Sequence, residues 1–134
     1  MEIASFDDLL LAARAQPEPQ RLLFVFAGVE LPDDATPQQR ERFAAGQGGA
    51  LVPLMCVDKL PDEIASFETL AEESRQFGHD WVIVFAAAMS GTLNHVPSSE
   101  DAEKPLQRMV DAIKQGAHSA FIPFNRQGEP VRFG

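Results

Sequence analysis

The stretch RLLFVFAGVEL, residues 21–31, decides the fold because it is almost wholly apolar and rich in residues that favour β-strands. A strand of this composition is typical of the middle of a sheet, where both faces are covered. The stretch DWVIVFAAAM, residues 80–89, is the most apolar of the chain, contains no proline and predicts a second central strand. We therefore expect the core to form around these two strands.

Helices and one further strand are predicted around this centre. Residues 5–14 place apolar side chains at helical spacing behind a capping serine, and residues 36–46 contain a capping box that predicts a short helix. Residues 66–78 predict a third helix, whose apolar face includes Phe77. The stretch LVPLMCVD, residues 51–58, predicts a strand whose proline either confines it to an edge of the sheet or delays its start.

The C-terminal part of the chain predicts a helix followed by a hairpin. An apolar stripe at helical spacing runs up to Gly116. Because a proline inside a helix costs about 3 kcal/mol, we expect the regular helix to begin at Pro105 rather than at Ser99. Residues 119–133 place turn-forming residues between two short apolar runs and predict an antiparallel β-hairpin.

Together these elements predict a single α/β domain over residues 1–134. Strict alternation of helices and strands favours right-handed crossovers, so we expect a mixed, mostly parallel sheet of about five strands. The helices are expected to pack on this sheet, with the C-terminal antiparallel hairpin at one side. The sequence contains no internal repeat and no linker that would divide it.

Charge and hydropathy narrow the classes of partner. A net charge of −9 argues against nucleic-acid binding, which depends on clustered Lys and Arg, and would steer the protein toward a basic partner. No apolar run approaches the roughly 18 residues of a membrane span, so no membrane association is expected. The stretch MEIASFDDLL, residues 1–10, is acidic where a secretory signal would be basic, which predicts a cytoplasmic protein.

The stretch AAMSGTLNHVPSSED, residues 87–101, gathers more polar side chains than any other part of the chain. It follows a predicted central strand and precedes a helix, the position at which open parallel α/β sheets bind ligands. The residues predicted to contact a ligand are Ser90, Thr92, Asn94, His95, Ser98 and Ser99.

An alternative interpretation of this stretch is purely structural. Ser98 or Ser99 then caps the following helix, Asp101 completes the capping box, and the preceding residues form ordinary turns. Glu100, Asp101 and Glu103 would repel a phosphate unless they point away. The sequence leaves both interpretations open, and no spacing enforces a nucleophile beside His95, so no catalytic residue is assigned.

Two other features favour structural roles. The stretch GQGG, residues 46–49, stands between a helix and a strand, whereas phosphate-binding loops run from a strand into a helix. We interpret it as a helix end and a turn. Cys56 is the only cysteine, so no disulfide is expected. Its apolar neighbours predict a buried structural thiol with a raised pKa.

The three histidines do not predict a shared metal centre. His79 and His118 precede strands, whereas His95 follows one, which places them at opposite ends of a parallel sheet. A pair formed by His79 and His118, with Asp80, stays open as a weaker alternative. We predict neither a metal nor a cofactor.

Nearly the whole chain is covered by five stretches: SFDDLLLAARAQPEPQRLLFVFAGVELPDDATPQQRERF, GGALVPLMCVDKLPDE, DWVIVFAAAMSG, PSSEDAEKPLQRMV and FNRQGEPVRFG. Through these stretches the chain resembles a family of short bacterial proteins described as "ribonucleotide reductase subunit alpha". The resemblance implies an accessory role in ribonucleotide reduction. It carries over no catalytic residue, because a true large subunit uses several cysteines in a far larger barrel and this chain has Cys56 alone. LVPL followed by SFETL also resembles the SseB-like domain.

Three functional hypotheses follow. The first is a small cytoplasmic protein-interaction or regulatory module without catalysis, motivated by the missing motifs, the acidic charge and the proline-marked edge strands. The second is a protein that binds a small anion or nucleotide at residues 90–99. The third is a hydrolase or transferase that uses His95, or an accessory protein in ribonucleotide reduction.

Overall fold

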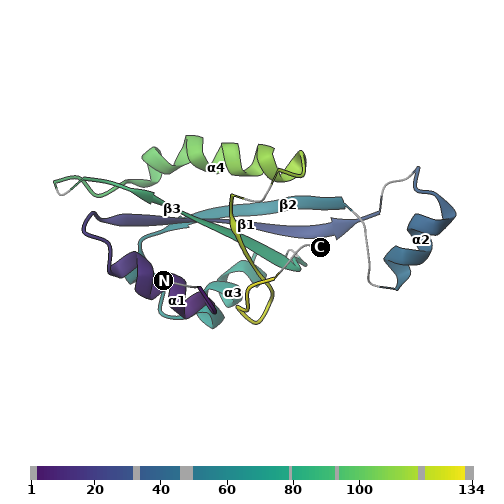
Figure 1. The fold of residues 1–134 in the computed structure, drawn as a ribbon, viewed down its shortest axis with the longest axis horizontal. Coiled ribbons are helices and arrows are strands. Elements are labelled where there is room, and N and C mark those ends of the chain that lie inside the picture. Colours follow the sequence, from purple (N-terminus) through teal and green to yellow (C-terminus); the bar gives the residue numbers. More distant parts are fainter. Residues whose placement is uncertain are drawn as a thin grey trace.

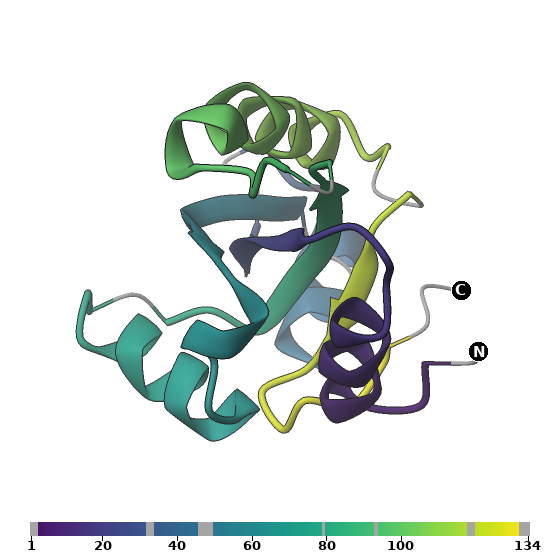
Figure 2. The same cartoon turned by 90° about the vertical axis from the view of Figure 1, so that its left-hand side faces the viewer.

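A computed structural model of the protein describes residues 3–31, 34–45, 50–78, 80–92, 94–117 and 120–131. The elements in chain order are α1 (Phe6–Arg14), β1 (Gln20–Glu30), α2 (Pro37–Ala44), β2 (Ala50–Lys59), the 3-10 helix η1 (Pro61–Glu63), α3 (Phe67–Arg75), β3 (Ile83–Ser90), α4 (Ser99–Lys114) and β4 (Ile122–Phe124). The sheet lies between two helical layers, with α4 on one face and α1 and α3 on the other (Figure 1; Figure 2). In the described ranges, no helix has the length and apolarity needed to cross a bilayer.

The sheet has four strands in the order β2-β1-β3-β4, and every neighbouring pair is antiparallel. The expected mixed, mostly parallel sheet of about five strands is therefore wrong. The two strands predicted at the centre do lie inside the sheet, since β1 pairs with β2 and β3, and β3 pairs with β1 and β4. The prediction of an edge position for the proline-containing strand β2 is confirmed.

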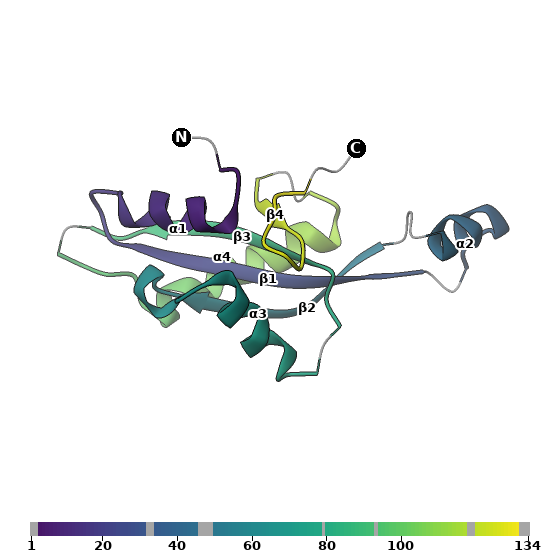
Figure 3. The same cartoon turned by 90° about the horizontal axis from the view of Figure 1, so that it is seen from below.

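The helix α2 explains why alternation of helices and strands misled the topology. Its sequence, PQQRERFA, has no apolar stripe with which to pack on a sheet. It lies beyond the end of the sheet, as both Figure 1 and Figure 3 show, so β1 and β2 form an antiparallel pair with a helix in their long connection. The connection through α3 does make β2 and β3 run in the same direction. The two strands are not neighbours, however, because β1 lies between them.

The core has two parts, one on each side of the sheet. On the side of α1 and α3, the ring of Phe6 lies 5.0 Å from that of Phe67 and 5.4 Å from that of Phe124 between centroids. On the other side, Ala102, Leu106, Met109 and Ile113 of α4 form the predicted helical stripe over Leu23, Val25 and Phe85. Burial on both faces comes from these helical layers, and it does not require parallel strands.

Helix α4 begins at Ser99, not at Pro105, which corrects the sequence-based boundary. Ser98 is the N-cap: its hydroxyl accepts a hydrogen bond from the amide of Asp101, and the Asp101 carboxylate accepts one from the amide of Ser98. This capping box and the burial of Ala102, before the proline, offset the cost of Pro105 inside the helix.

The C-terminal hairpin is reduced to a short strand and one bridge. β4 pairs with β3, and an isolated bridge joins Phe124 to Pro130. The Asn125 side-chain carbonyl accepts from two amides of the turn, and Gly128 adopts the positive φ of 78° that the turn requires. The second strand of the predicted hairpin does not extend beyond that bridge within the described residues.

Candidate functional site

The polar run predicted as a site lies at the end of the sheet where β1 begins. The backbone amide of Gly91 donates to the carbonyl of Pro19 at 2.9 Å, and the side-chain amide of Gln20 donates to the hydroxyl of Ser90 at 2.8 Å. Because the sheet is antiparallel, this end is not the switch point of a parallel sheet. The positional argument for a ligand site in residues 90–99 is therefore wrong.

Within the run, hydrogen bonds of the backbone and of the two serine side chains serve local structure. Thr92 and His95 exchange backbone hydrogen bonds at 3.0 and 3.1 Å and enclose a tight turn that contains Asn94. Ser98 caps α4, as the structural alternative proposed, and Ser99 donates its hydroxyl to Asp58 of β2 at 2.7 Å. Ser98 and Ser99 therefore hold the start of α4 and join it to β2.

His95 and Asp101 form the one pair in this run that resembles catalytic machinery. Nε2 of His95 lies 3.1 Å from Oδ2 of Asp101, but the His95 side chain is 66% exposed. The backbone amide of Ser98, and then the hydrogen bond with His95, hold the pKa of Asp101 below its ordinary value. Among the described residues no hydroxyl is hydrogen-bonded to the His95 ring, so the pair lacks a nucleophile.

A buried ion pair beneath the run fixes its position. Nη1 of Arg21 lies 2.6 Å from Oδ2 of Asp58, and the two side chains are only 10% and 17% exposed. Nε of Arg21 donates to the carbonyl of Pro97 at 2.6 Å, and Ser99 binds the same carboxylate. The pair thus joins β1, β2 and the start of α4. An arginine that opens an otherwise apolar strand is the sequence signal that could have revealed it.

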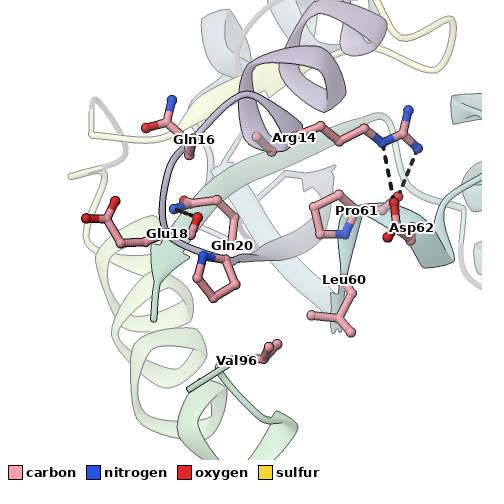
Figure 4. Close-up of a pocket in the computed structure, with 10 residues that line it drawn as sticks. Arg14, Gln16, Glu18, Gln20, Leu60, Pro61, Asp62 and Val96 are labelled. Carbon is pink, nitrogen blue, oxygen red and sulfur yellow. Dashed lines mark hydrogen bonds and ion pairs between the residues drawn. The ribbon is translucent and has the colours of Figure 1, made fainter. Parts of the chain in front are cut away.

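A cavity of about 450 Å³ opens beside this end of the sheet. Its lining comes from the end of α1 and the α1–β1 connection, from Leu60 and η1 after β2, and from Val96 of the polar run (Figure 4). Its volume suits a small ligand, but its polar groups already bind one another. The guanidinium of Arg14 donates to the carbonyl of Pro61, and the side-chain amide of Gln20 donates to the backbone carbonyl of Glu18 and to the hydroxyl of Ser90. The cavity therefore offers few free groups to orient a ligand.

Two of the sequence-based alternatives fall outside the described residues. These are the pair of His79 and His118, and the GQGG stretch at residues 46–49. Within the part of the chain that is described, no three His, Cys, Asp or Glu side chains are grouped to hold a metal ion.

Cys56 corrects another expectation, because it is exposed rather than buried. It lies on the edge strand β2, where neighbouring side chains cover it only in part. Partial burial, and then the negative charge of Asp58, raise the pKa of its thiol, which is the direction that the sequence predicted. The side chains of Cys56 and Asp58 share the α4 face, since their partners on β1 are Val25 and Leu23.

The outer edge of β2 is a second candidate site, and sequence reasoning identified it only as an edge. No other strand of the described chain pairs with it. In an antiparallel ladder, hydrogen-bonded and non-hydrogen-bonded residue pairs alternate. The backbone bond from Gly91 to Pro19 makes that pair hydrogen-bonded, so the next pair, Gln20 and Ser90, is not. The backbone groups of Gln20, and of every second β1 residue after it, therefore point toward β2. Cys56 and Asp58 of β2 lie opposite the other β1 residues, whose backbone groups face β3. The amides and carbonyls of Cys56 and Asp58 therefore point away from the sheet.

An apolar cavity of about 140 Å³ lies beside this edge, between β2 and α3. Phe77 was expected on the buried face of its helix, yet it is 66% exposed at the rim of this cavity. The one hydroxyl in the lining, that of Ser74, accepts from the Trp81 indole and donates to the carbonyl of Ala71. The cavity is smaller than the ~300 Å³ typical of small-molecule sites and fits one apolar side chain. Its lining residues are Phe26, Met55, Val57, Lys59, Leu70, Glu73, Ser74 and Phe77.

The fold and the two candidate sites define a small α/β protein with an open sheet edge. Comparison of the chain with protein-family models, curated proteins and solved structures found no match.

Proposed function

We propose that this chain is a non-catalytic protein-interaction module that binds an extended segment of a partner protein along the outer edge of β2. The observation that carries the proposal is the juxtaposition of an unpaired edge strand with an apolar cavity and an exposed Phe77. An edge strand supplies affinity through main-chain hydrogen bonds, and a side-chain pocket supplies specificity.

The geometry of β2 supports this mode of binding. The outward amides and carbonyls of Cys56 and Asp58 are spaced to pair with a partner strand. On the α3 face, the side chains of Met55 and Val57 line the cavity, so a partner strand in register would place a side chain above it. The exposed ring of Phe77 would cover that side chain from the other side.

The protective features of the edge strand mark the limit of the binding segment. Natural proteins block their sheet edges with prolines and bulges. In β2, Pro53 and the bulge opposite Phe26 and Ala27 occupy the first half of the strand. Residues 55–59 beyond them carry neither device. The binding segment that we propose is therefore this second half of β2.

The charges at the start of α4 favour this proposal over binding of a small anion at residues 90–99. The Asp101 carboxylate occupies the amide of Ser98, and Glu100 adds a second negative charge in the first turn of α4. A phosphate would be repelled there. We further propose that the interaction takes place in the cytoplasm, and an accessory role in ribonucleotide reduction stays a prediction.

The test uses a synthetic peptide in which valine alternates with threonine, titrated into the protein while backbone amide shifts are recorded. We expect saturable shifts along residues 55–59 and around Phe77. Cys56→Pro removes one outward amide at a position where an edge strand tolerates proline, and it should abolish the shifts. Cys56→Ser keeps the amide and should bind as the unaltered protein does. Shifts confined to residues 90–99, or equal binding by both variants, would contradict the proposal.

A further inference from the structure

We infer that the partner segment is basic, with a Lys or Arg two positions from the apolar residue that enters the cavity. This inference rests on the proposed function, because it specifies the chemistry of a strand bound at β2. It is carried by the charges on α3, the helix that lies beside the cavity.

The exposed side of α3 forms a shallow acidic trough next to the apolar cavity. A depression of about 420 Å³ is lined by Ser66, Glu68, Thr69, Glu72, Glu73 and Gln76. Glu73 lines both this trough and the cavity, so the two are contiguous. A segment that fills the cavity therefore passes directly beside three carboxylates.

The cations of this region neutralise only part of that charge. Nζ of Lys59 lies 3.0 Å from Glu73, and Nη1 of Arg75 lies 3.1 Å from Glu72. In the described chain, Glu68 has no cationic partner. The Arg75–Glu72 pair is exposed, at 62% and 67% of the two side chains, so water screens it strongly. A net negative charge is left to attract a cation from outside.

The spacing of an extended strand matches this arrangement. Side chains two positions apart lie on the same face of a strand, about 7 Å from each other. When one apolar side chain enters the cavity, its neighbour on that face lies over or beside the trough, where a long Lys or Arg reaches a carboxylate. The net charge of −9 also favours encounter with a basic segment.

The same charges disfavour a second copy of this chain as the occupant. Antiparallel pairing of two β2 edges about a two-fold axis would place both α3 helices on one face of the joined sheet. Their glutamates would then lie near one another, which like-charge repulsion opposes. A partner of opposite charge satisfies both the edge and the trough.

The experiment compares two further peptides of equal length by isothermal titration calorimetry. In both, threonine occupies every second position, and the positions between the threonines alternate valine with lysine in one peptide and valine with glutamate in the other, so that each valine has a charged residue two positions away on its own face. We expect the lysine peptide to bind at least about tenfold more tightly than the glutamate peptide, because the latter places like charges against α3. The double variant E68Q/E72Q should reduce this preference several-fold. The control D7N/E103Q removes two exposed carboxylates from α1 and α4 and should leave it unchanged.

The outcomes separate this inference from the proposed function. If the valine–threonine peptide binds at β2 while the lysine and glutamate peptides bind equally well, the basic partner is refuted and strand addition stands. Equal loss of preference in E68Q/E72Q and D7N/E103Q would show a general charge effect and would also refute it. If none of the three peptides binds at β2, the proposed function fails and this inference fails with it. Dimerisation through β2 in the absence of peptide would overturn the choice of occupant.

Discussion

Replacing Arg21 by methionine should strongly destabilise the protein. The Arg21 side chain is only 10% exposed, and its guanidinium binds Asp58 and the carbonyl of Pro97 at 2.6 Å each. The Asp58 side chain is 17% exposed in the intact protein. Removing the guanidinium leaves its carboxylate with the hydroxyl of Ser99 as the remaining hydrogen-bond donor. Removing one member of a buried ion pair costs ~3–5 kcal/mol, and the surviving bond to Ser99 places this case near the lower value, about 3 kcal/mol.

Urea unfolding provides the assay, because Trp81 is the only tryptophan and is 3% exposed in the folded protein. For a domain of this size the slope is about 1–3 kcal/mol per molar urea, so the midpoint should fall by roughly 1–3 M. The double variant Arg21→Met/Asp58→Leu should be more stable than Arg21→Met alone, since it removes the uncompensated charge as well. A change in Arg21→Met within about 0.5 kcal/mol, as at ordinary surface sites, would refute the role assigned to the pair.

Three further predictions concern single residues. A thiol reagent should modify Cys56 in the folded protein, and the rate should continue to rise at pH values where an ordinary thiol has levelled off, because burial and then Asp58 raise its pKa. The carboxyl of Asp101 should titrate below its ordinary pKa, chiefly because it accepts from the backbone amide of the N-cap residue. Its stabilising contribution is therefore present above the unfolded-state pKa and is lost as the pH falls through the folded-state pKa. Asp101→Asn should remove that acid-range loss, as followed by unfolding at a series of pH values. Gly128→Ala should destabilise more than Gly78→Ala in thermal unfolding: both have positive φ, but only at Gly128 would the new Cβ meet a side chain, the Phe67 ring at 2.9 Å.

Much of the fold could be predicted from local sequence patterns. The apolar runs that became β1 and β3 identified the interior strands, because burial on both faces leaves no polar alternation. Helical periodicity located α1 and α3, and a capping serine marked the start of α1. Alternation of helices and strands gave the wrong strand directions, because it takes no account of the missing apolar stripe in α2.

The candidate site was less predictable, because its features depend on strand order. Pro53 indicated an edge strand, but only the register with β1 shows which amides of β2 point outward. The sequence placed Phe77 on an apolar helical face, whereas α3 ends at Arg75 and the chain turns at Gly78, so that the ring lies outside the core. Cys56 has apolar neighbours in sequence, yet the position of β2 at the edge leaves it exposed.

Amide hydrogen exchange along β2, measured with and without the valine–threonine peptide, tests the central claim most directly. Strand addition predicts a period of two: exchange at the outward amides of Cys56 and Asp58 should slow markedly, while that at Val57, which already faces β1, should change little. Uniform protection across the sheet, or protection confined to residues 90–99 with Cys56 and Asp58 unchanged, would contradict the account.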